Sequence, residues 1–93
     1  MLAWARTEVF AFVIYFKQGT KESDKDKVKK WTQQLVDASI SCNGTYYLPY
    51  QIYATAEQFT KAYSAAVNFL ALKKRLDPTN KFRNKLWDRY YMQ

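Results

Sequence analysis

The chain has 93 residues, enough for one domain, and a domain this short buries only about 60% of its unfolded surface or slightly more. Hydrophobic residues make up 48% and aromatic residues 18%, which argues against disorder and predicts apolar surface that faces a partner or another domain. The net charge is +7, with one cysteine and no histidine, so the chain alone builds no disulfide framework and no Cys–His or Ser–His–Asp centre, and a zinc site is not expected.

Positive charge is concentrated in two stretches, residues 17–30 and 73–89. A basic balance can attract nucleic acid, anionic lipid or an anionic cofactor, but acidic residues alternate with the lysines of the first stretch, as on ordinary solvated surface. The apolar run Val9–Phe16 has only eight residues, well short of the roughly 18–20 that cross a membrane. We therefore expect no membrane span, and the first residues show no signal peptide.

Residues 2–16 predict a β-strand, because β-branched and aromatic side chains dominate and alternate between two faces. Both faces are apolar beyond Val9, which is typical of a strand covered on both sides. Ser23 or Asp24 is then expected to cap a helix that runs to about Ser41. Its apolar stripe, at spacings of three and four, predicts a helix lying on a sheet: Val28, Trp31, Leu35, Ala38 and Cys42.

The helix is expected to stop at Asn43-Gly44, where either residue can take the left-handed conformation. Residues 45–53 predict a second strand, with Pro49 marking an edge or a bulge. This stretch holds four tyrosines in nine residues. Each hydroxyl needs a hydrogen-bond partner, so the stretch is a candidate pocket wall, with ordinary sheet packing as the alternative.

A capping box of Thr55 and Gln58 predicts the start of a second helix that continues to about Leu76. Pro78 ends it, and Asp77 is expected to cap the turn with its carboxylate. A short helical segment with Asn80 at its cap should follow. The predicted fold is α+β: an antiparallel sheet backed by helices, in the order β-α-β-α with a short C-terminal helix, forming a single domain over residues 1–93.

Groups that carry chemistry are scarce. Two glycines do not make a phosphate-binding loop, and the acidic residues of the first basic stretch lie among lysines. Glu8 is the one acid amid apolar neighbours, and an ion pair at a strand end is its simplest role. The chain therefore offers little as an enzyme on its own.

From Gly44 to Tyr90, however, the chain resembles the C-terminal segment of FAD-linked oxidoreductases of the vanillyl-alcohol oxidase and berberine-bridge-enzyme type. Those proteins end with a strand near the flavin, a helix, a basic turn containing Asp-Pro, and a Phe-x-Asn return. The matching residues are Tyr46-Tyr47-Leu48-Pro49-Tyr50, Phe69, Lys73, Asp77-Pro78 and Phe82-Arg83-Asn84. The ordered set covers about half of the chain.

The resemblance implies that the chain is a C-terminal fragment of the substrate (cap) domain of a larger flavoenzyme, with a ferredoxin-like fold. The FAD-binding domain would lie upstream, and the fragment alone is expected to hold no cofactor. Tyr47 and Gln51 would face the substrate, and Asn84 would contact the flavin domain. Tyr50 stands where some relatives carry histidine, and it would donate a hydrogen bond or act as a base if its pKa were lowered. In the intact enzyme a small organic substrate would lose a hydride to FAD.

Two other functions remain open at this point. One is a basic nucleic-acid-binding module, in which strand tyrosines stack on bases and lysines contact phosphates. The other is a dimeric interaction module, a homo-oligomer paired through the apolar faces of its sheet. The sequence does not give the substrate, the electron acceptor or the compartment.

Overall fold

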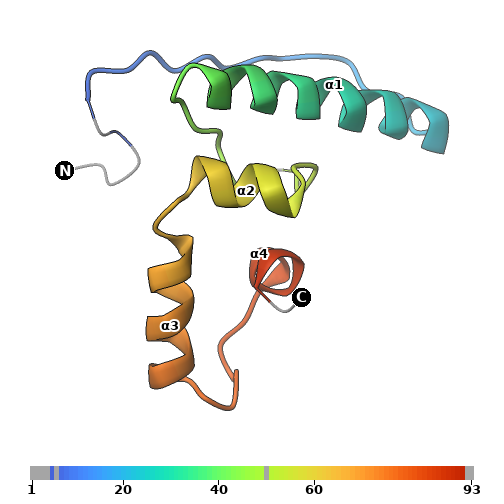
Figure 1. The fold of residues 1–93 in the computed structure, drawn as a ribbon. Coiled ribbons are helices and arrows are strands. Elements are labelled where there is room, and N and C mark those ends of the chain that lie inside the picture. The colour runs from blue at the N-terminus through green and yellow to red at the C-terminus, as the bar shows by residue number, and fades with distance from the viewer. Residues whose placement is uncertain (1–4, 6, 50, 92–93) are drawn as a thin grey trace.

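The computed structural model describes residues 5, 7–49 and 51–91, and it is helical throughout these ranges, with no strand. The helices are α1 (Glu22–Ser41), α2 (Ala56–Ala62), α3 (Ala66–Leu76) and α4 (Lys85–Tyr90). Figure 1 shows α1 running along the top of the molecule, α2 beneath it, and α3 and α4 farther below. Contacts join α1 to α2 and α2 to α4. The predicted ferredoxin-like α+β fold is therefore wrong.

Both predicted strands are chain segments that have no strand partner among the described residues. Residues 9–19 run straight along α1, and residues 44–48 and 51–53 connect α1 to α2 (Figure 1). The alternation of side chains correctly indicated an extended course for the first segment. A sheet also needs a neighbouring strand that takes up the backbone hydrogen bonds, and the two segments do not supply that to each other.

Helix α1 begins one turn earlier than the sequence predicted, with Lys21 at the N-cap and no side-chain cap. Glu22 and Asp24 occupy the first turn, where negative charge complements the helix dipole. At the other end Asn43 takes the left-handed conformation with φ 58°, as expected, and the Gly44 N–H donates to the Ser39 carbonyl over 2.8 Å.

The buried face of α1 is narrower than the predicted stripe. Val28 and Val36 are buried, Trp31 is half-buried, and Leu35 is exposed. Cys42, expected to be a small buried residue, is exposed as well. The stripe is incomplete because no sheet lies beneath it.

Helix α2 begins at the predicted capping box. The Thr55 side chain accepts from the Gln58 N–H over 3.1 Å, and the Gln58 side chain accepts from the Thr55 N–H over 3.0 Å. Gln58 is also buried against α1, where its amide donates to the Gln33 carbonyl and to Asp37 Oδ1. One side chain therefore starts α2 and fixes it to α1.

The single helix predicted from Thr55 to Leu76 is broken at residues 63–65. Tyr63 caps the end of α2 with φ −123° and ψ 69°, outside helical geometry. Its hydroxyl donates to the Tyr46 carbonyl in the segment before α2. The break lets α3 turn steeply away from α2 (Figure 1).

The core is small. The buried hydrophobic residues among those described are Val28, Val36, Ala54, Phe59, Ala62 and Trp87. The radius of gyration is 15.0 Å, against about 12 Å for a compact domain of this length. The molecule is thus more open than a closed globule, and large apolar side chains remain at its surface.

Candidate functional site

A tight turn between α3 and α4 organises the C-terminal half of the chain. The Asp77 carboxylate accepts the Lys81 N–H on Oδ1 and the Phe82 N–H on Oδ2, each over 2.9 Å. It also forms an ion pair with Lys73, which reaches back from the last turns of α3. The hydrogen bond from Lys73, followed by the two backbone N–H donors, lowers the pKa of Asp77 to about 2.

This turn differs from the sequence prediction in one residue. Asn80, expected to cap the short helix, instead takes the left-handed conformation with φ 53° inside the turn. Asn84 is the N-cap of α4, because its side chain accepts the Trp87 N–H over 2.8 Å. The Asp-Pro turn and the Asn84 cap together fix where α4 starts.

Helix α4 carries aromatic rings into the space between α2 and α3. Trp87 stacks on Tyr91 with ring centroids 4.6 Å apart, and Tyr90 stacks on Phe59 of α2 at 4.3 Å. The Lys73 ammonium lies 4.8 Å from the centre of the Trp87 ring. The turn and the rings therefore support one another.

Between these elements lies a groove of about 930 Å³, referred to below as the aromatic groove. Thr45 and Leu48 line it from the segment before α2, and Asn84 lines it at the start of α4. Three basic residues also line it: Lys73, Lys81 and Arg83. Its aromatic walls come from α2, α3, α4 and the chain beside them: Phe59, Tyr63, Phe69, Phe82, Trp87 and Tyr91.

The charge of the aromatic groove is mostly balanced. Lys73 pairs with Asp77, and Arg83 pairs with Asp88 over 3.2 Å. Lys81 has no such carboxylate partner among the described residues, and the groove lining includes no acidic side chain. The groove suits a flat apolar or aromatic group with at most modest negative charge.

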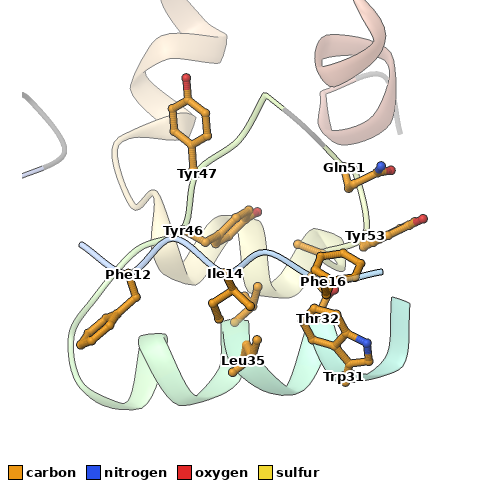
Figure 2. A pocket seen from close by; sticks show the side chains of 12 residues that line it. Phe12, Ile14, Phe16, Trp31, Thr32, Leu35, Tyr46, Tyr47, Gln51 and Tyr53 are labelled. Carbon is orange, nitrogen blue, oxygen red and sulfur yellow. The ribbon is translucent and has the colours of Figure 1, made fainter. Parts of the chain in front are cut away.

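A smaller hollow of about 260 Å³ lies between α1, the extended N-terminal segment and residues 46–54 (Figure 2). Phe16 packs edge-on against Trp31 of α1, with ring centroids 4.7 Å apart. Tyr47 and Gln51 both line this hollow. Figure 2 shows the Tyr47 ring pointing away from α1, and 70% of that residue is exposed.

The half-buried tyrosines remain protonated. Burial raises the pKa of Tyr46 well above its ordinary value, with smaller contributions from Tyr90 and Tyr63 nearby. Burial likewise raises the pKa values of Tyr63 and Tyr90. These hydroxyls can donate hydrogen bonds at neutral pH, but they are not bases.

Two enclosed polar atoms, the Tyr46 hydroxyl and Trp87 Nε1, have no hydrogen-bond partner of good geometry in the described part of the chain. The Tyr90 hydroxyl, which interacts with Tyr46, donates to the Ala54 carbonyl over 3.0 Å. A buried donor without a partner costs stability. Both atoms belong to residues that line the hollows, so the polar groups of these surfaces are not fully satisfied within the chain.

The predicted site residues do not form one site. Tyr47 and Gln51 share the small hollow, Asn84 lines the aromatic groove, and Tyr50 lies outside the described residues. The sequence did not predict that Phe59, Trp87 and Tyr91 would join in one wall. The aromatic spacing after Pro78 was the available signal, but it does not show which helix those rings meet.

Comparisons with protein-family models, with curated proteins and with solved structures found no match for this chain. Within the described ranges, no group of three or more metal-ligating side chains is placed to hold an ion. No helix in the same ranges is both long enough and apolar enough to cross a bilayer.

Proposed function

We propose that this chain is the C-terminal segment of the substrate domain of an FAD-dependent oxidoreductase, which oxidises a small organic substrate by hydride transfer to the flavin. In this role the chain is a wall and a positioning element. It is not a catalyst by itself, and its partner is the FAD-binding domain of the same protein.

One observation carries this proposal: residues of the flavoenzyme resemblance, dispersed over the sequence, gather around the aromatic groove. Leu48, Phe69, Lys73 and the stretch 82–84 all line it. Asp77 stands behind the groove and holds the turn that brings those elements together. A shared local turn would explain Asp77 and its neighbours, but it does not explain why Leu48 and Phe69 meet them.

The aromatic groove fits one part of FAD and not the rest. Its rings and its low charge suit one face of a flat ring system. The chain has only two glycines and no loop that cradles a pyrophosphate, so the phosphates require another domain. When bound there, the flavin supplies the hydride acceptor, and the residues of this chain exclude water and orient the groups beside it.

The predicted site residues take positioning roles in this proposal. Tyr47, largely exposed, and Gln51 present polar groups at the rim of the small hollow toward substrate. The Asn84 carbonyl is used as the cap of α4, which leaves its amide nitrogen to donate to the flavin domain. Tyr50, assigned from the resemblance, is proposed to donate a hydrogen bond on the substrate side.

The test uses the protein that the complete reading frame encodes, purified with its native cofactor. We expect it to carry bound flavin, visible in its absorption spectrum. Phe82→Ala should shift the flavin absorption or fluorescence and weaken flavin retention, because Phe82 lines the groove while being 79% exposed, so its loss does not open the core. Phe10→Ala is the matched control, since Phe10 is 89% exposed and lies away from the groove.

A colourless protein that takes up no added FAD would contradict the proposal. A flavoprotein in which Phe82→Ala and Phe10→Ala leave the same spectrum would contradict the placement of the groove at the flavin.

A further inference from the structure

The N-terminal arm, residues 7–18, is the largest exposed apolar feature that the proposed function leaves unexplained. Eight consecutive apolar residues, Val9–Phe16, lie in it. Phe10 is 89% exposed, Phe12 88% and Tyr15 93%. The arm runs along one side of α1 (Figure 1).

The backbone of the arm indicates what kind of partner would cover it. Residues 9–19 form no backbone hydrogen bond with another described part of the chain, so their N–H and C=O groups are available along an open edge. Such an edge, flanked by β-branched and aromatic side chains and free of proline, is a template for another strand. Lipid or a flat apolar surface would leave these polar groups unsatisfied.

We propose that the arm pairs with the arm of a second copy of this chain, as an antiparallel two-stranded ribbon about a twofold axis between Phe12 and Val13. This inference does not rest on the proposed flavoenzyme function.

The register follows from charge complementarity. When Phe12 lies opposite Val13 of the second copy, Glu8 lies opposite Lys17, and the twofold axis repeats this pair at the other end of the ribbon. Both residues are exposed, and neither has an ion pair among the described residues. The apolar pairs between them join aromatic with β-branched, aromatic or small side chains: Val9–Phe16, Phe10–Tyr15, Ala11–Ile14 and Phe12–Val13.

The same register explains why both faces of the arm are apolar. Phe12, Ile14 and Phe16 line the small hollow against α1 of their own copy (Figure 2). Opposite residues in an antiparallel pair point to the same face, so in this register the odd-numbered residues of one copy share a face with the even-numbered residues of the other. Val13 and Tyr15 would therefore be covered by α1 of the second copy.

The lengths of the two elements agree with this arrangement. Eight extended residues span about 26 Å, and the twenty residues of α1 span about 30 Å, so one α1 covers the whole ribbon on each face. A two-stranded ribbon alone is marginal in water, and a helix on each face supplies the burial that it lacks.

The experiment is sedimentation equilibrium of the purified chain at low ionic strength, over a range of concentrations. We expect a monomer–dimer equilibrium for the native sequence. Glu8→Lys and Lys17→Glu should each raise the dimer Kd roughly tenfold, because each change converts two cross-strand attractions into repulsions. Asp26→Lys and Lys29→Glu on the exposed side of α1 change the charge by the same amounts and should leave the Kd near the native value.

Mixing the two arm variants gives the sharper result. A Glu8→Lys chain facing a Lys17→Glu chain has opposite charges at both ends of the ribbon, so the mixture should form heterodimers with near-native Kd. The double variant should also restore dimerisation. A native chain that stays monomeric at every concentration, or one that forms only larger aggregates, would overturn the proposal. So would single variants that dimerise normally, or a mixture that associates no better than its components.

Discussion

Gln58 is the residue that holds most of the inter-helical hydrogen bonds in the upper half of the molecule. It completes the capping box of α2 and donates to the Gln33 carbonyl and the Asp37 carboxylate of α1. A buried amide with this many partners is specific to one arrangement, because each partner is lost if α2 rotates or shifts.

Replacing Gln58 with alanine should therefore lower the free energy of unfolding by about 2 kcal/mol, from lost hydrogen bonds and an unsatisfied Thr55 N–H. Urea denaturation measures the change. Gln34→Ala is the control, because Gln34 is exposed on α1. Its effect should stay within about 0.5 kcal/mol. Equal losses from both variants would show that Gln58 does not fix α2 to α1.

Asp77 makes the stability of the C-terminal turn depend on pH. Its pKa is lowered to about 2 in the folded chain, chiefly by the hydrogen bond from Lys73. A carboxylate with a lowered folded pKa stabilises the fold fully above its unfolded pKa, near 3.9. This stabilisation disappears as the pH falls from about 4 through about 2.

We expect Asp77→Asn to lower the Tm at neutral pH and to differ less and less from the native chain as the pH falls through this range. Thermal melts monitored by circular dichroism measure both. Asp26→Asn, an exposed carboxylate on α1 outside the turn, is the comparison. A gap between native and Asp77→Asn that is constant down to about pH 2 would mean that the carboxylate is not what holds the turn.

Among the elements, α4 is the shortest helix and depends most on its cap and its packing. It spans Lys85–Tyr90, its N-cap is Asn84, and its one buried residue is Trp87. A helix of six residues has almost no stability of its own in water.

Asn84→Ala should cost about 1 kcal/mol of stability through loss of the cap. Urea denaturation with tryptophan fluorescence follows both the global transition and the environment of Trp87. The matched control is Asn68→Ala, an exposed position inside α3 where alanine favours the helix. An Asn84→Ala chain as stable as the Asn68→Ala chain would contradict the assigned cap.

The helix boundaries show which elements local sequence determines. The capping box at Thr55, the left-handed Asn43 and the Asp77 turn were all predicted, because each depends on groups a few residues apart. The break at Tyr63 was not predicted, since Tyr-Ser-Ala-Ala contains no helix breaker. A hydroxyl contact to Tyr46, seventeen positions away, accompanies it.

The sheet failed for the same reason on a larger scale. Alternating side chains in residues 9–16 indicate an extended backbone but not a neighbour to pair with, and the described chain contains none. The candidate site was predicted only in part. Tyr47 and Gln51 share a hollow as expected, whereas the gathering of Phe59, Phe69 and Trp87 in one groove depends on how three helices meet.

At the scale of the whole molecule, the central feature is that this chain does not close its own core. Few hydrophobic residues are buried, and the arm and the aromatic groove leave many large apolar side chains at the surface. Monomeric proteins rarely expose apolar surface on this scale without a partner for it. The proposed flavin domain would cover the groove, and the second copy would cover the arm.

Small-angle X-ray scattering of the Glu8→Lys variant, in which the arms should not pair, tests this feature most directly. The account predicts a monomer with a radius of gyration near 15.0 Å and flattened dimensions close to 41 × 35 × 20 Å. A compact monomer near 12 Å, the value for a closed globule of this length, would contradict it.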